Sequence, residues 1–146
     1  MDEGPRFFTV EEANGLVAAL EIEFGRVARV RSELAPLVES MGAEVASRVL
    51  QEEGAAPAGR EEDARHLVAL AAEITAAVER INAMGCLVKD LEAGLVDFYA
   101  LKDDEPVFLC WQFGERAVGH WHALDEGFGG RKPIEGAASP EPSFPN

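Results

Sequence analysis

Two long stretches of the chain repeat apolar residues three and four positions apart, the spacing of an amphipathic helix. The first stretch begins at a capping box, in which Thr9 precedes Glu12 and Phe8 stands at the staple position. Pro36 lies inside it and predicts a kink there. The second stretch follows the breaker GAAPAG and ends at Gly85. We expect the two to form a long antiparallel helical hairpin over residues 9–84.

After this hairpin the apolar residues alternate, which indicates β-strands. CLVKDL is a short candidate strand, and residues 95–101 and 107–113 are stronger ones, joined by a four-residue loop at 102–105. This loop length predicts one wholly apolar face that should pack on the helices. Its expected pairs are Val96 with Trp111, Phe98 with Leu109, and Ala100 with Val107. The opposite face should place Asp97 across from Cys110.

The predicted fold class is therefore α+β. A helical hairpin (9–84), with its first helix kinked near Pro36, packs on a small antiparallel β-meander within a β-region at 86–133. A glycine-rich C-terminal loop closes that region. We expect residues 1–133 to form one domain and residues 134–146, which are rich in proline and serine, to be a disordered tail.

Charge excludes two classes of partner. The 146 residues include 13 basic and 27 acidic side chains, a formal net charge of -14. Such a surface repels nucleic acids and anionic membranes, so neither is expected as a partner. No apolar run approaches the roughly 20 residues of a membrane span, and no signal peptide is visible. Cys86 and Cys110 have no metal-type spacing, which favours reduced thiols in a cytoplasmic protein.

The residues able to bind metal or move protons gather between 94 and 133. In a strand, His120 and His122 share one face and can chelate one ion. Asp97 or Glu115 would complete a divalent-metal site, for which zinc is the favoured ion. The alternative is that these histidines only form hydrogen bonds, and that Asp97 is exposed or forms a salt bridge.

The turn before the histidines decides which face they occupy. A four-residue turn at 114–117 would put His120 beside Trp111, on the face that packs on the helices. A five-residue turn would put His120 and His122 on the face of Asp97 and Cys110. A slip of one residue exchanges the two faces, so the sequence does not decide between the two turns.

A small-molecule ligand is a second possibility in this region. Arg131 ends the glycine-rich run GFGGR, whose backbone N–H groups can bind a phosphate or carboxylate. Trp111 and Trp121 can line a ligand pocket, although tryptophans at such positions more often belong to the core. Cys110 is a candidate ligand contact or nucleophile, with a buried packing role as the alternative.

Three long motifs carry a resemblance to a known family. They are FTVEEANGL, GCLVKDLEAGLVDFYA and VFLCWQFGE…WHALDEGFGGRKP. On these motifs the chain resembles a bacterial family of uncharacterised proteins, domain of unknown function 2203. The resemblance implies no activity. The family pattern includes Trp121-His122, Gly127-Phe128, Gly130-Arg131 and Pro133, and often has an acidic residue where this chain has Ala123.

Three functions compete on the sequence alone. The leading one is a cytoplasmic protein with a polar and aromatic site that binds a divalent metal through His122, Asp97, Glu115 and His120. The second is a non-catalytic, coiled-coil-like interaction module, with a homodimer as the expected assembly. The third is a binder of small anionic ligands that uses Arg131. Whether the protein is an enzyme stays open.

Overall fold

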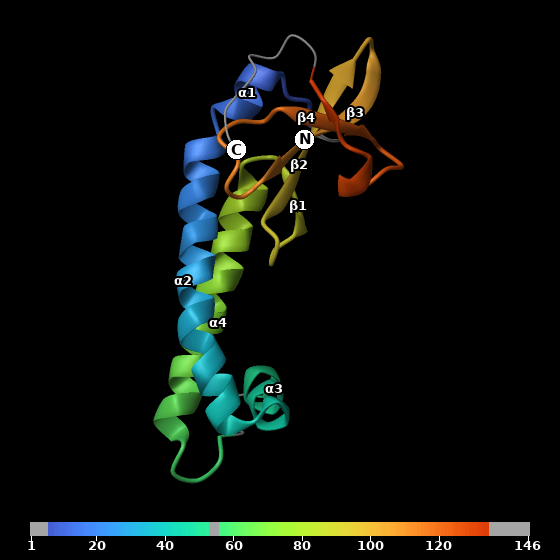
Figure 1. The fold of residues 1–146 in the computed structure, drawn as a ribbon. Coiled ribbons are helices and arrows are strands. Elements are labelled where there is room, and N and C mark those ends of the chain that lie inside the picture. Colours follow the sequence, from blue (N-terminus) through green and yellow to red (C-terminus); the bar gives the residue numbers. More distant parts are fainter. Residues whose placement is uncertain (1–5, 53–55, 135–146) are drawn as a thin grey trace. The chain divides into compact units, whose positions relative to one another are not determined.

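The computed structural model describes residues 6–52 and 56–134. Within them, helices and one antiparallel sheet give an α+β fold, as the sequence predicts (Figure 1). The helices are α1 (Val10–Asn14), α2 (Val17–Met41), α3 (Ala43–Gln51), α4 (Glu61–Ala83) and the 3-10 helix η1 (Phe128–Gly130). The strands are β1 (Leu87–Asp90), β2 (Leu95–Lys102), β3 (Glu105–Gln112), β4 (His120–Ala123) and β5 (Lys132–Pro133).

The capping box at the first helix is confirmed. The Thr9 hydroxyl accepts from the backbone N–H of Glu12, and the Glu12 carboxylate accepts from the N–H of Thr9. The helix it starts is short, because Gly15 ends α1 and α2 begins at Val17. This end presents Asn14, whose side-chain oxygen accepts from the N–H of Val118 at 2.7 Å. A turn far along the chain is thereby fixed to α1.

Helix α2 runs unbroken through Pro36 and ends at Met41. The proline ring therefore does not interrupt the helix. A bend of the helix axis at Pro36 stays a prediction. The chain breaks instead at Gly42, whose φ of 95° lies in the region that favours glycine. A separate helix, α3, follows this break.

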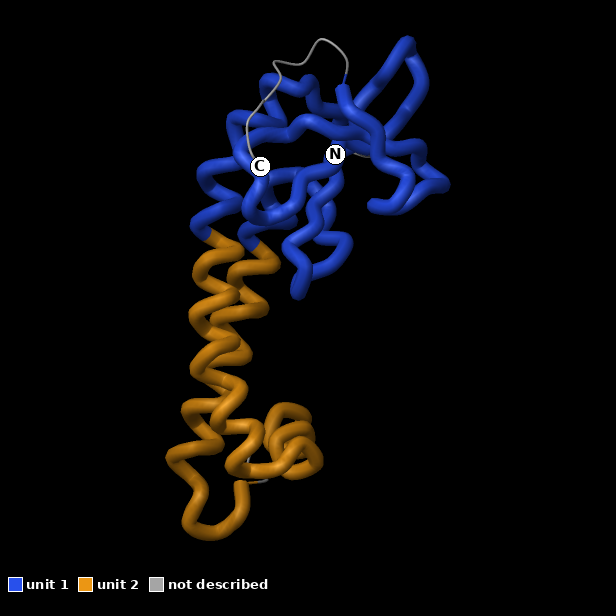
Figure 2. The backbone as a smooth tube through the Cα atoms, viewed as in Figure 1, with its two compact units in different colours: residues 1–22, 80–146 blue, residues 23–79 orange. Residues whose placement is uncertain are grey.

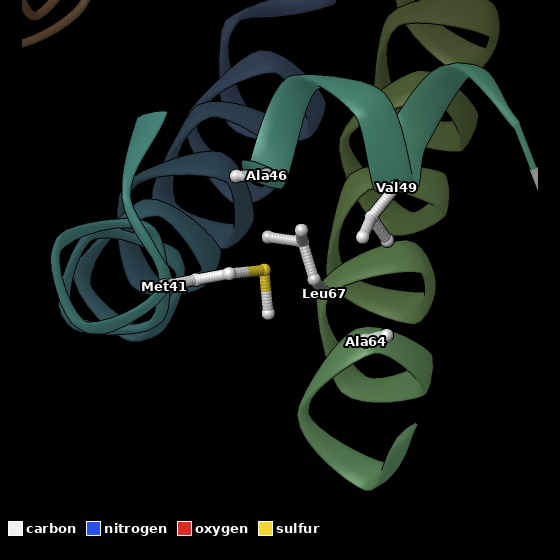
Figure 3. Packing of buried hydrophobic residues seen from close by; sticks show 5 residues of the cluster. All are labelled: Met41, Ala46, Val49, Ala64 and Leu67. Carbon is white, nitrogen blue, oxygen red and sulfur yellow. The ribbon is translucent and has the colours of Figure 1, made fainter. Parts of the chain in front are cut away.

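The chain divides into two compact units (Figure 2): unit 1 comprises 1–22 and 80–146, and unit 2 comprises 23–79. In unit 2, α2 and α4 lie side by side, and the Arg29 guanidinium donates to both Glu33 and Glu73. Around α3, apolar side chains of three helices form a buried cluster (Figure 3) of Met41, Ala46, Val49, Ala64 and Leu67. The packing of the whole hairpin on the sheet stays a prediction.

In unit 1, the strands form a meander in the order β1-β2-β3-β4-β5. The predicted β2–β3 register is confirmed at all three apolar pairs and at Asp97 with Cys110. The loop is shorter than predicted, however, because Lys102 pairs with Glu105 and leaves a two-residue turn. Asp103 and Asp104 adopt φ values of 52° and 68°, as a type I′ hairpin requires. Both loop lengths give the same register.

The connection between β3 and β4 is longer than either predicted turn. Cys110 pairs with His120 and Phe108 pairs with His122, so the connection spans 113–119. The histidines share the face of Asp97 and Cys110, as the five-residue turn predicted, because His120 pairs with Cys110 and His122 lies two residues further along β4.

The apolar face of the sheet belongs to the core of unit 1. Trp111 and Phe98 are fully buried, and the ring of Phe8 meets that of Phe98 edge-on at 5.1 Å. The N–H of Phe8 donates to the carbonyl of Tyr99 at 2.7 Å, which fixes the N-terminal segment to β2. None of the helices formed by the described residues has the length and hydropathy to span a membrane. The disordered tail predicted at 134–146 lies, except for Ile134, outside the described residues.

The geometry of the turn before β2 requires a glycine at position 94. Its φ is 73°, and a Cβ atom there would lie 2.5 Å from the Cβ of Phe113. We expect Gly94→Ala to lower the free energy of unfolding by at least about 1–2 kcal/mol, the cost of the left-handed conformation alone. Gly127→Ala, where the backbone is extended and a Cβ meets nothing within 4 Å, is the control. Urea denaturation of both variants measures the difference, and equal stability would contradict this geometry.

Candidate functional site

Three buried side chains from neighbouring strands converge on the polar face of the sheet. Asp97 on β2 lies directly across from Cys110 on β3, and His122 projects from β4. Their exposed fractions are 3%, 1% and 1%. One ligand atom from each lies within 4.8 Å of the others, and no other group of this kind occurs in the described part of the chain. We call this set the sheet-face triad.

The imidazole of His122 is oriented by a backbone carbonyl. Its Nδ1 lies 2.9 Å from the carbonyl oxygen of Ala123, and a carbonyl only accepts, so Nδ1 carries a hydrogen. Its Nε2 lies 3.1 Å from Oδ2 of Asp97. Two lone pairs facing each other would repel, so either a proton or a cation must lie between these atoms. A ring fixed through one nitrogen, with the other facing acidic ligands, is the usual arrangement of a metal-binding histidine.

Burial governs the electrostatics of the triad. It raises the pKa of the Asp97 carboxyl, and the neighbouring His122, followed by Lys89, partly opposes this rise. Burial also raises the pKa of the Cys110 thiol to about 11, against the hydrogen bond that Arg131 donates. The thiol of Cys110, across the ladder from Asp97, also lowers the pKa of this carboxyl. The His122 imidazole contacts the Asp97 carboxylate, which differs from a nucleophilic dyad, where a base contacts the sulfur.

Arg131 and Glu115 border the triad on the sulfur side. The Arg131 guanidinium donates to Sγ of Cys110 at 3.5 Å and forms an ion pair with the Glu115 carboxylate. Glu115 also accepts from the backbone N–H of Gln112 at 2.9 Å, and its carbonyl accepts from the Trp111 indole at 3.1 Å. Glu115, a predicted metal ligand, is therefore engaged by Arg131. Arg131, a predicted anion contact, is likewise occupied.

His120 lies beside the triad without joining it. It pairs with Cys110 across the β3–β4 ladder, so the two side chains are neighbours on one face. Its Nδ1 is buried and has no hydrogen-bond partner among the described residues. Burial, and then Arg131, lower the pKa of this imidazole. A neutral ring with an unused nitrogen is thus available next to the sulfur.

The two tryptophans lie on the other face of the sheet. Trp111 is fully buried and takes part in the core of unit 1. Trp121 is half-buried, and the ammonium groups of Lys102 and Lys132 lie 5.1 and 4.7 Å from its ring centroid. Neither indole borders the triad, so the residues predicted as one ligand-binding set are divided between the two faces.

Sequence reasoning did not place Cys110 among the metal ligands and did not identify the Ala123 carbonyl. The signal for Cys110 was present, because the hairpin register put it across from Asp97. The role of Ala123 depends on local backbone geometry, which no side-chain pattern encodes.

The buried thiols give a direct test of these electrostatics. Burial raises the pKa of Cys86 and of Cys110 to about 11 from 9.0, so at a given pH below 9 each holds less thiolate when folded than when unfolded. We expect iodoacetamide at about pH 8 to modify the metal-free folded protein at least roughly tenfold more slowly than the urea-unfolded chain. Mass spectrometry of Cys86→Ala and Cys110→Ala assigns each rate. Modification of folded Cys110 at the unfolded rate would contradict the buried-thiol description.

Comparisons with known proteins place the chain in a family. Searches of curated proteins and of solved structures gave no match. The family model described as "Uncharacterized conserved protein (DUF2203)" matches residues 6–134, which include every strand and the whole sheet-face triad. The chain therefore belongs to the DUF2203 family of uncharacterised conserved proteins.

Proposed function

We propose that this protein binds a divalent transition metal, with zinc as the preferred ion, through Asp97, Cys110 and His122. The observation that carries the proposal is the convergence of three buried donor atoms within 4.8 Å, one of them on an imidazole already oriented by a carbonyl. This set replaces the sequence-based one, since Cys110 takes the place of Glu115 as the third ligand.

The donor types select the ion. A thiolate with an imidazole and a carboxylate suits zinc, whereas calcium and magnesium require oxygen ligands. Bonds of about 2.0–2.3 Å to a tetrahedral ion hold ligand atoms about 3.3–3.8 Å apart, so the triad needs to contract by about 1.5 Å at most. The two negative charges of Asp97 and Cys110 would balance the ion, while Arg131 donates to the sulfur from outside the ligand set.

His120 is the candidate for the fourth position. It neighbours Cys110 across the ladder, and its buried Nδ1 has no partner among the described residues. A change in its side-chain torsion is needed, because the ring lies outside the triad as described. Protein ligands would then occupy all four coordination positions, as in a structural metal site. In such a site the free energy of metal binding adds to the stability of the fold, here of the sheet.

Metal binding is tested on tag-free protein with zinc and with cobalt as a spectroscopic substitute. We expect one zinc ion per chain and a thiolate-to-cobalt charge-transfer band. Asp97→Asn and His122→Ala should weaken zinc binding by about 10–100-fold or more, and Cys110→Ala should also remove the band. Cys86→Ala and His66→Ala, which change the other cysteine and the exposed histidine of α4, are matched controls. Absence of bound zinc, or equal losses in the controls, would refute the proposal.

Metal removal tests the structural role separately. We expect a chelator to lower the melting temperature of the zinc-loaded protein, because an ion bound to the folded state stabilises it by mass action. The chelator should leave the melting temperature of Cys110→Ala unchanged. Equal melting temperatures with and without the chelator, for protein shown to contain zinc, would contradict the structural role while leaving metal binding intact.

Two sequence-based predictions accompany this proposal. A cytoplasmic location, where thiols stay reduced, suits a site built on a thiolate. The homodimer predicted from the helical seams stays a prediction, which light scattering of the purified protein would check. A role as a non-catalytic interaction module is compatible with a structural metal.

A further inference from the structure

We infer that unit 1 has a second binding site, on the opposite face of the sheet from the triad, for a small aromatic carboxylate. The site is a cavity of about 380 Å³, a volume within the roughly 300–1,000 Å³ of small-molecule sites. Its lining combines the apolar side chains of Phe8, Ala100, Val107, Leu109 and Trp121 with the polar ones of Thr9, Lys102 and Asp103. It is independent of the proposed metal site, because none of these residues belongs to the triad.

The sheet register explains why one wall of this cavity is apolar. Ala100 pairs with Val107, and Leu109 pairs with Trp121, so their side chains share the face that carries Phe98. The N-terminal segment fixes Phe8 beside them through its backbone hydrogen bond to β2. These contacts form a preorganised apolar wall, and the half-buried indole of Trp121 adds a flat surface on which a ring can stack.

The polar groups at the cavity indicate an anionic ligand. The Thr9 hydroxyl and the backbone N–H of Phe8 are already engaged. The Lys102 ammonium lies over the Trp121 ring, and its ion-pair partner Asp103 is 91% exposed, where water weakens the pair. Lys132 also lies over this ring, but it does not line the cavity and is paired with Glu126, so Lys102 is the cation available to a ligand.

Together these features select the class of ligand. An apolar ring system would fill the cavity and stack on Trp121, while its carboxylate would accept from Lys102. This site differs from the anion site that the sequence suggested, because Arg131 is occupied by Glu115 and lies on the other face. A neutral analogue would gain the apolar contacts without the charged one.

The test is calorimetric titration with naphthoate, and with neutral naphthylmethanol, in the presence of a chelator so that no metal contributes. We expect saturable binding of one naphthoate and at least roughly tenfold weaker binding of naphthylmethanol, the loss of one charge-assisted contact. Lys102→Met should weaken naphthoate binding by about the same factor. Lys89→Met removes an ammonium that lies over an aromatic ring, Phe108, outside the cavity, and should bind like the unmodified protein.

Trp121→Leu should abolish saturable binding and also remove the quenching of tryptophan emission by naphthoate, since Trp111 is buried away from the cavity. If circular dichroism shows that Trp121→Leu is unfolded, Lys102→Met still tests the inference. The Lys102 side chain is 50% exposed, so replacing it leaves the core intact. The inference is overturned if folded protein shows no saturable binding. It is also overturned if naphthylmethanol binds equally well, or if Lys102→Met and Lys89→Met behave alike.

Discussion

A buried carboxylate has to be neutralised, and this requirement governs the polar face of the sheet. Asp97 is 3% exposed, and its isolated charge there would be costly. The imidazole of His122 meets the requirement at 3.1 Å, and it is oriented to do so because its other nitrogen donates to Ala123. A proton between the two groups, or a metal ion in its place, satisfies the same constraint. The His122 imidazole is therefore the group on which the buried charge of Asp97 depends.

Charge balance extends outward from this pair in an ordered way. Cys110 lies between Asp97 and Arg131, and Arg131 is neutralised by Glu115, which the β3–β4 connection holds through backbone contacts. Each charged group thus has a partner of opposite sign. Replacing the thiol proton with zinc would leave Arg131 donating to a thiolate, a stronger contact than the one to a thiol. Arg131 can consequently donate to Cys110 both as a thiol and as the zinc-bound thiolate that we propose.

The β2–β3 hairpin was predictable from sequence because local rules determine it. Strict alternation and a short loop define the register, and loops of two and four residues give the same pairs. The β3–β4 register was not predictable, since its connection is held by the side chain of Asn14, 104 positions before Val118. The same limit applies to the triad. Sequence identified Asp97 and His122 and placed Cys110 across from Asp97. Only the β3–β4 register brings His122 to these two residues, while Glu115 pairs with Arg131.

The protonation of the His122 imidazole tests the central claim most directly. Long-range proton–nitrogen NMR of uniformly labelled protein distinguishes its two nitrogens, and His122→Gln assigns the signals. The account predicts a protonated Nδ1 with and without zinc, and an Nε2 resonance that shifts when one equivalent of zinc is added. An unprotonated Nδ1, or an Nε2 resonance that zinc leaves unchanged, would contradict it.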